Sequence, residues 1–274
     1  MANIAAILVS GKSIQHKLTV AEGLTSDMVW KLVQKDSDLM GDAGPVPQEG
    51  TLLPETYLFT RGETRAGLLA RMVEAQAKFL DEKWTARDTG LPYKTLREAV
   101  ILASIVEKES ALAEERRHVA SVFVNRLKMG MKLQSDPTII YDISRGYPLG
   151  RGIRQSELAA ATPYNTYVIA GLPPGPISNP GKDSLNAVLN PEQTNDLYFV
   201  ATGRGGHVFS ATVEGQAKNV AAYRVFERQQ QDLPESRQVQ ASGQIGDTNV
   251  TVLDPSTPKL PPAPARKKHA ARHR

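Results

Sequence analysis

Cysteine is absent from this chain of 274 residues. Its absence excludes disulfides, thiolate nucleophiles and cysteine-ligated zinc, and it fits an oxidising compartment as well as a reducing one. The five histidines offer no metal-ligand spacing, because His269 and His273 lie near the C-terminal end and the other three are far apart. The sequence therefore predicts no metal site and no cofactor.

Long apolar runs are also missing. The run from Ile4 to Val9 is far shorter than the ~20 residues of a membrane-spanning helix, and it lacks the basic start and cleavage site of a signal peptide. We therefore expect neither a transmembrane segment nor an export signal in this chain. Residues 4–11 have the pattern of a helix end whose beginning is missing, so we expect a truncated or alternatively started polypeptide.

Acidic residues are missing from the C-terminal segment, residues 255–274. Without its six basic residues, the formal net charge of +4 becomes −2, so a general nucleic-acid-binding surface is not predicted. Nucleic-acid binding by this segment alone stays an alternative, and it would depend strongly on salt. The Pro-rich, aperiodic sequence of residues 229–274 predicts a disordered tail. The six basic residues are Lys259, Arg266, Lys267, Lys268, Arg272 and Arg274.

Strand and helix patterns fill the rest of the chain. Residues 13–20 alternate apolar and polar side chains as a half-buried strand does, and residues 196–202 and 207–210 have the pattern of a β-hairpin. His207 in that hairpin is expected to satisfy a local hydrogen bond rather than to act in catalysis. Residues 52–60 are extended but broken by Pro54, which indicates an edge strand or a structured loop. Helices are predicted over residues 25–35, 64–84, 95–109, 114–128, 184–189 and 213–230.

The helix over residues 95–109 has the clearest start. Thr95 and Glu98 stand three residues apart, as in a capping box, and an apolar run follows directly. Glu107 lies ~200° around the helix from Glu109, so the two carboxylates are predicted to face different surroundings. Glu109 ends an apolar stripe whose other members are Leu102, Ile105 and Val106.

A carboxyl group on an apolar stripe is costly to ionise, since burial raises its pKa. Glu109 would then be a proton donor near neutral pH, which is the task of the acid in glycosidases. The alternative is that Glu109 only ends the helix and meets solvent or a lysine, and the pattern alone favours this alternative. For Glu107 a solvated helix face is favoured more strongly.

Residues 129–181 are dense in glycine, proline, asparagine and tyrosine, which indicates ordered loops of the kind that carry function. Asp136 is a candidate second carboxylate, but an aspartate before a proline is also a common turn initiator. A saccharide would suit four neighbouring side chains, because aromatic faces stack on sugars while amides and hydroxyls bind their hydroxyl groups. The alternative is that the tyrosines pack beneath a turn. These four residues are Tyr164, Asn165, Thr166 and Tyr167.

Six sequence motifs follow one another along the chain, at Ile101–Ser110, Val122–Leu127, Leu133–Thr138, Tyr164–Tyr167, Gly171–Ile177 and Leu197–Ala201. In order and spacing this series resembles the MltG/YceG-like endolytic murein transglycosylase family. The resemblance implies an α+β fold with a mixed helical and β catalytic domain over residues 21–228. It also implies that residues 1–20 are the C-terminal remnant of a small LysM-like module and that residues 229–274 form the tail.

The resemblance also implies the chemistry. Glu109 matches the family's catalytic acid/base. The implied reaction cleaves the β-1,4 bond from N-acetylmuramic acid to N-acetylglucosamine in nascent peptidoglycan and leaves a 1,6-anhydro end, which terminates strand elongation. Because the substrate supplies the nucleophile, neither a cofactor nor a second catalytic carboxylate is required. The residues implied to bind or orient the glycan are Gln134, Asp136, Tyr164, Asn165, Thr166 and Tyr167.

The implied partners are peptidoglycan glycan strands and cell-wall synthases, and the implied location is the periplasmic face of the bacterial inner membrane. Two departures from the family pattern stand out. The family's membrane anchor is absent from this chain, and Gly215 and Gln216 stand where the family commonly has Glu-His. Two alternatives stay open: a non-catalytic protein that binds glycan or scaffolds the synthesis machinery, and a hydrolase that uses water and leaves reducing ends.

Overall fold

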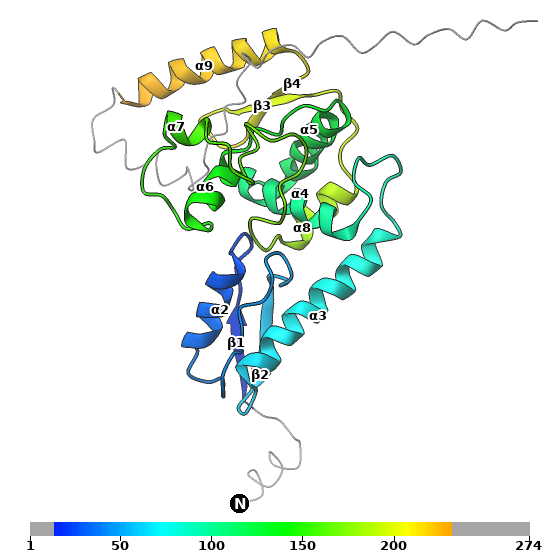
Figure 1. The fold of residues 1–274 in the computed structure, drawn as a ribbon, viewed down its shortest axis with the longest axis vertical. Coiled ribbons are helices and arrows are strands. Elements are labelled where there is room, and N and C mark those ends of the chain that lie inside the picture. The colour runs from blue at the N-terminus through cyan, green and yellow to red at the C-terminus, as the bar shows by residue number, and fades with distance from the viewer. Residues whose placement is uncertain (1–13, 232–274) are drawn as a thin grey trace, which may run out of the picture.

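The computed structural model describes residues 14–231, which form a mixed chain of helices and two small antiparallel sheets (Figure 1). The implied α+β class is confirmed. The predicted helix end at residues 4–11 and residues 232–274 of the predicted tail lie outside the described residues, whereas residues 229–231, assigned to the tail, belong to the last helix. The elements are β1 (Gln15–Thr19), α2 (Ser26–Lys35), β2 (Thr56–Thr60), α3 (Arg65–Trp84), α4 (Leu96–Glu109), the 3₁₀ turn η1 (Ala113–Glu115), α5 (Arg116–Lys128), α6 (Asp136–Ser144), α7 (Gln155–Leu158), α8 (Lys182–Leu189), β3 (Tyr198–Ala201), β4 (His207–Ser210) and α9 (Val213–Gln231).

Strands β1 and β2 pair antiparallel, with Leu18 opposite Tyr57 (Figure 1). Alternation along both strands turns one face of this sheet inward, where it packs with the apolar sides of α2 and of the first half of α3. We call β1, α2, β2 and α3 as far as Met72 the small lobe. Its buried core consists of Leu18, Val20, Val29, Val33, Leu39, Ala43, Leu52, Tyr57, Phe59, Leu68, Leu69 and Met72.

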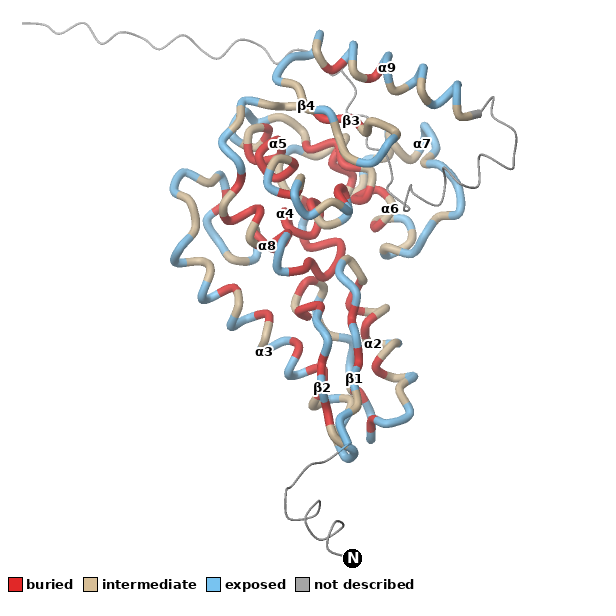
Figure 2. Tube along the Cα trace, turned by 180° about the vertical axis from the view of Figure 1, so that it is seen from behind, coloured by how far each residue is buried: buried red, intermediate tan, exposed pale blue. Residues whose placement is uncertain are grey.

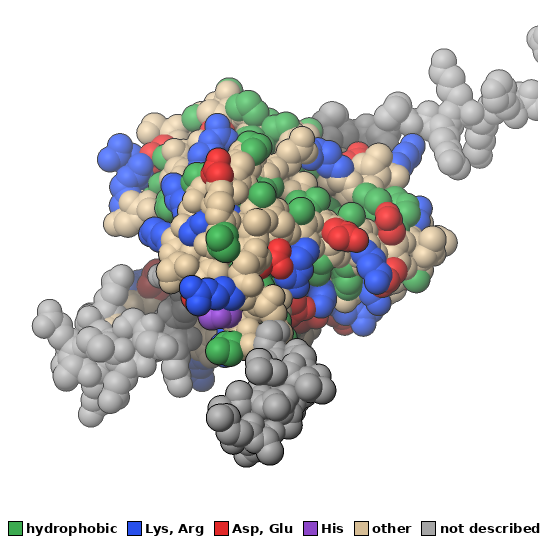
Figure 3. Space-filling view, turned by 90° about the horizontal axis from the view of Figure 1, so that it is seen from below, with side chains coloured by type: hydrophobic (Ala, Val, Ile, Leu, Met, Phe, Trp, Pro, Cys, Tyr) green, Lys and Arg blue, Asp and Glu red, His purple; other side chains and the backbone are tan. Residues whose placement is uncertain are grey.

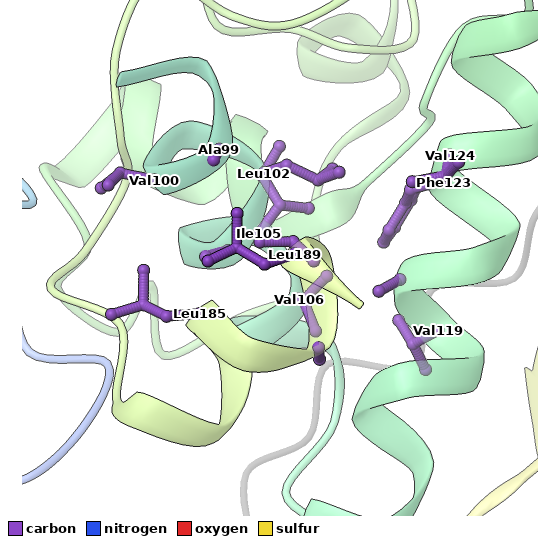
Figure 4. Packing of buried hydrophobic residues seen from close by; sticks show 14 of the residues in the cluster. Ala99, Val100, Leu102, Ile105, Val106, Val119, Phe123, Val124, Leu185 and Leu189 are labelled. Carbon is purple, nitrogen blue, oxygen red and sulfur yellow. The ribbon is translucent and has the colours of Figure 1, made fainter. Parts of the chain in front are cut away.

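The larger core lies among α4, α5 and α8. Every residue of α4 from Ala99 to Val106 is buried, so this helix is covered on all sides rather than along one stripe. Figure 4 shows side chains of the three helices pointing toward one another, among them Ile105, Phe123 and Leu189. We call the part of the chain built around this core the large lobe. Its central helix, α4, has a C-terminal end whose position is fixed by packing.

The hairpin of β3 and β4 lies between α5 and α9 (Figure 1). Phe199 of β3 packs edge-on against Phe123 of α5, with 5.8 Å between the ring centroids. Helix α9 is mostly exposed (Figure 2), but Gln216 is buried and its Nε2 donates to the Phe199 carbonyl at 3.1 Å. Gln216, one of the two residues that depart from the family pattern, therefore attaches α9 to β3.

Asn179 joins the two lobes. It is completely buried, and its side chain accepts the Leu52 N–H at 3.0 Å and donates to the Leu24 carbonyl at 3.0 Å. An ion pair of 3.0 Å between Glu22 and Arg116 adds a second connection. The small lobe is thus held against the large lobe by polar bonds as well as by the continuous helix α3.

Most of the predicted elements are confirmed, including the Thr95 capping box and the β3–β4 hairpin. The extended segment at residues 52–60 supplies β2, which begins after Pro54. The interpretation of residues 129–181 as loops is wrong for two segments, because α6 and α7 are helices. Helix α6 begins at Asp136, with proline in its first turn where no backbone N–H is needed.

Candidate active site

Glu109 is the last residue of α4 and is only 1% exposed. The predicted apolar stripe is confirmed, since Leu102, Ile105 and Val106 are completely buried. The alternative in which Glu109 meets solvent is therefore wrong. Because α4 is packed on all sides, the carboxyl group of Glu109 is held at a fixed place in the large lobe.

Ser135 contacts this carboxyl group directly, with its Oγ donating to Glu109 Oε1 at 2.5 Å. Ser135 stands at the N-cap of α6, where a serine side chain usually accepts a backbone N–H, but its hydroxyl makes no such capping bond. The Ser135 backbone N–H donates to Thr166 Oγ1 at 2.9 Å. Thr166 therefore fixes the loop that carries Ser135, and Ser135 orients Glu109.

Gln134 precedes Ser135 in a left-handed backbone conformation, with φ of 55°. For a residue other than glycine such a conformation costs about 1 kcal/mol or more, and functional sites are a common place for it. The Gln134 N–H donates to the Thr166 carbonyl at 3.1 Å, and its Oε1 accepts from Arg126 Nη1 at 3.0 Å. Both ends of Gln134 are therefore fixed by the loop opposite and by α5.

Arg126 of α5 is completely buried, although it was not among the predicted site residues. Burial lowers the pKa of Arg126 to about 10, and the nearby Tyr198, Tyr167 and Glu109 oppose that shift. The signal for its burial was its place at i+7 from Val119, on the same helix face. Its guanidinium donates to the carbonyls of Leu197 at 2.6 Å, Lys132 at 2.9 Å and Leu133 at 3.3 Å, besides Gln134.

Asp136 and Tyr167 form the next contact, because the Tyr167 hydroxyl donates to Asp136 Oδ1 at 2.6 Å. Burial raises the pKa of Asp136, and the hydrogen bond from Tyr167 opposes this rise. Burial also raises the pKa of Tyr167, and Asp136 and Glu109 add to the rise. Asp136, Tyr167 and Glu109 therefore belong to one electrostatic cluster.

Tyr164 is half-buried, and its ring lies 5.0 Å from the ring of Tyr141 on α6. Asn165 is 1% exposed, and its Oδ1 accepts the Tyr167 N–H at 3.0 Å. The amide of Asn165 is thus engaged inside the loop. Its Nδ2 donates to the carbonyls of Glu157 at 3.1 Å, Leu158 at 3.0 Å and Ala160 at 2.7 Å.

The prediction that Glu107 lies on a solvated helix face is wrong. Its side chain is 4% exposed, with Oε1 at 3.0 Å from Arg116 Nη2, and Oε2 accepts the Gly181 N–H at 2.9 Å. Burial raises the pKa of Glu107, and the charge of Arg116 opposes the rise. The period of α4 alone cannot show that α5 and the start of α8 cover this face. Glu107 therefore joins α4, α5 and α8.

His207 makes a hydrogen bond, but its partner is not local as predicted: its Nδ1 lies 2.7 Å from Oε2 of Glu115 in η1, 92 residues earlier in the chain. Within residues 14–231, no group of three or more His, Cys, Asp or Glu side chains is arranged to hold a metal ion. In the same part of the chain, no helix has the length and apolarity needed to cross a membrane. Lysines and arginines are interspersed with acids on the face shown in Figure 3, which carries charges of both signs.

The Asp136→Asn variant is expected to gain stability relative to the wild type as the pH rises. A carboxyl whose pKa is raised in the folded state holds its proton more tightly there, so its ionisation costs stability above about pH 4, the unfolded value. Asparagine is neutral at every pH. The difference in free energy of unfolding, variant minus wild type, should therefore increase from about pH 4 to pH 7 in urea denaturation.

Asp81→Asn, at an exposed position of α3, is the control variant, because it removes one negative charge from the surface. The same pH series on this variant measures how the loss of a surface charge alone changes the free energy of unfolding. If the difference in free energy of unfolding between Asp136→Asn and the wild type stays constant or decreases over this pH range, the pKa of Asp136 is not raised in the folded protein.

The fold and the site together define an α+β protein with a buried glutamic acid at the end of its central helix, held by a serine on an adjoining loop. Residues 1–222 match the model of the YceG-like family, so the chain belongs to this family. A crystal structure of a YceG-like protein from Listeria monocytogenes has a similar fold, with a TM-score of 0.60 and 30% identity over 79% of this chain and 80% of that one.

Two curated relatives are similar in sequence. The endolytic murein transglycosylase of Bacillus subtilis is 35% identical over 177 residues, which are 65% of this chain and 48% of that protein. The endolytic murein transglycosylase of Streptococcus pneumoniae serotype 2 is 36% identical over 182 residues, 64% of this chain and 32% of that protein. The matched region therefore spans half or less of the length of these relatives.

Proposed function

We propose that this chain is the catalytic part of an endolytic murein transglycosylase, with Glu109 as its acid and base. The proposal rests on the position of Glu109, which ends α4, is 1% exposed and accepts a hydrogen bond from Ser135. The names of the relatives from Bacillus subtilis and Streptococcus pneumoniae support the same activity. Burial shields the Glu109 carboxyl group from water, which supports its role as a proton donor.

The proposed reaction uses Glu109 twice. Its protonated carboxyl donates a proton to the oxygen of the β-1,4 bond as that bond to C1 of N-acetylmuramic acid breaks. The resulting carboxylate accepts the proton of the muramic C6 hydroxyl, whose oxygen bonds to C1 and closes a 1,6-anhydro ring. No water is consumed, and Glu109 ends in its starting protonation state. Ser135, which is held by Thr166, keeps the carboxyl oriented through both steps.

The proposed substrate is the glycan strand of nascent peptidoglycan, whose elongation this cleavage terminates. Gln134, Asp136, Tyr164 and Tyr167 would bind or orient the sugars. Asn165 and Thr166 would support the same loops from within, since their polar groups bond to neighbouring backbone atoms.

The proposed setting is the periplasmic face of the inner membrane, with cell-wall synthases as partners. We further propose that residues 1–20 are the C-terminal remnant of the family's LysM-like module and that residues 21–228 form the catalytic domain, with β1 at the end of that remnant paired to β2 of the catalytic domain.

Product analysis on purified peptidoglycan tests the proposed reaction. The wild-type protein is expected to release fragments with 1,6-anhydro ends, which mass spectrometry identifies because they are lighter by one water than fragments with reducing ends. Reducing ends alone would replace the proposal by a hydrolase, in which water takes the place of the C6 hydroxyl. Binding of glycan without any cleavage would leave only a recognition or scaffolding role.

A further inference from the structure

Two exposed arginines, Arg97 on α4 and Arg145 at the end of α6, stand beside Tyr164 of the candidate site. Arg97 Nη2 and Tyr164 Oη lie 3.4 Å and 2.9 Å from the point where a Cβ on Gly175 would stand. The Arg145 guanidinium lies 5.6 Å from the ring centre of Tyr141, which packs against Tyr164. Each guanidinium group therefore lies near one ring of a pair of packed tyrosines, Arg97 near Tyr164 and Arg145 near Tyr141.

Neither guanidinium has an ion-pair or hydrogen-bond partner within residues 14–231. Both charges nevertheless act on the Tyr164 hydroxyl: burial raises its pKa, and Arg145 and Arg97 oppose the rise. Two acids, Glu49 and Asp142, act on the same hydroxyl. Glu49 is engaged elsewhere, because it accepts from the Ser26 N–H at 2.8 Å and from the Tyr141 hydroxyl at 3.3 Å.

The backbone at Arg145 gives an independent indication. Arg145 is the C-cap of α6 and is left-handed, with φ of 56° and ψ of 38°. Glycine or asparagine is the usual residue in this position, because a side chain with a Cβ costs about 1 kcal/mol there. The backbone therefore does not explain an arginine at this place, whereas a role for its side chain does.

We infer that Arg97 and Arg145 form an anion subsite that binds carboxylate groups of the short peptides carried by murein. This inference rests on the proposed function and extends it from the sugar to the peptide. Tyr164 lies two residues before Thr166, whose Oγ1 holds the loop that carries Ser135, so the loop beside the arginines continues to the candidate active site. A guanidinium fork matches a carboxylate, and a tyrosine ring beside it suits a sugar face.

Binding measured in the Glu109→Gln background tests the subsite without cleavage. The two probes are soluble murein glycan chains that keep their peptides and the same chains after an amidase has removed the peptides and the lactyl carboxylates that this hydrolysis exposes have been converted to amides. Arg97→Gln and Arg145→Gln are each expected to weaken binding of the peptide-bearing chains about fivefold, and together more than about tenfold. Binding of the stripped chains should be unchanged, and added salt should reduce the difference between the two probes.

Arg61→Gln, at an exposed arginine in the turn after β2, is the matched control and should leave both affinities unchanged. Equal weakening for both probes, or weakening for neither, would overturn the subsite. Cleavage by the protein with native Glu109 is measured separately on the same two probes. If the arginine variants weaken binding of the peptide-bearing chains alone but the protein with native Glu109 forms no anhydro products, the proposed function is refuted and the subsite is supported.

Discussion

Replacement of Glu109 by glutamine is expected to lower the rate of anhydro-end formation about 10³-fold, with glycan binding retained. Glutamine has nearly the same shape, and its amide oxygen can accept the Ser135 hydrogen bond that Glu109 Oε1 accepts at 2.5 Å. The amide cannot donate a proton to the leaving oxygen and then recover one from the C6 hydroxyl. Initial rates on purified peptidoglycan and the affinity of the same sample for glycan separate chemistry from binding.

Glu107→Gln is the matched control, two residues earlier on the same helix. Glu107 is paired with Arg116 at 3.0 Å and bonded to the Gly181 N–H, so its replacement should lower stability but leave the rate per folded molecule within about twofold. A Glu109→Gln variant that retained more than about a tenth of the wild-type rate would mean that another group supplies the proton.

Replacement of Arg126 by methionine is expected to lower the free energy of unfolding by about 3–5 kcal/mol. Methionine fills much of the space but leaves the carbonyls of Lys132, Leu133 and Leu197 without this donor inside the protein. Gln134 also loses the bond to its Oε1, so the loop beside Glu109 loses its attachment to α5. Urea denaturation followed by circular dichroism measures the loss.

Arg117→Met tests whether burial causes this effect. Arg117 is the second residue of α5 and is exposed, with its Nε donating to the Asn190 carbonyl at 2.9 Å. Its replacement should cost no more than about 1 kcal/mol, because water can take over an exposed hydrogen bond. Similar losses for the two variants would refute the role given to the buried guanidinium of Arg126.

The helices that the sequence predicted best carry their signals within a few residues. Thr95 and Glu98 form the capping box, and Thr25 and Thr64 cap α2 and α3 with side-chain bonds to the third residue on. Such caps depend on local geometry, so the sequence alone can indicate them. The helical period placed Glu109 at the end of the apolar stripe, but by itself it favoured the alternative in which this carboxyl group meets solvent or a lysine.

The parts that were missed depend on contacts between distant segments. Ser135 lies within the motif Leu133–Thr138 but was not predicted as a site residue, because its bond to Glu109 joins residues 26 apart. Glu107 was assigned to solvent because α5 and the residue before α8 cover it from elsewhere in the sequence. Helix α6 was hidden by the glycine and proline around it, although Ser135 and Pro137 form a recognisable helix start.

The buried amide of Asn179 has a consequence for how the protein unfolds. Its bonds to Leu24 and Leu52 can exist only while both lobes are folded, and α3 contributes to both hydrophobic cores. Separation of the lobes would expose these polar groups and part of the apolar surface together, so the two regions should melt in a single cooperative transition. A graft that moved β1, α2 and β2 to another scaffold would have to replace this amide as well as the apolar contacts.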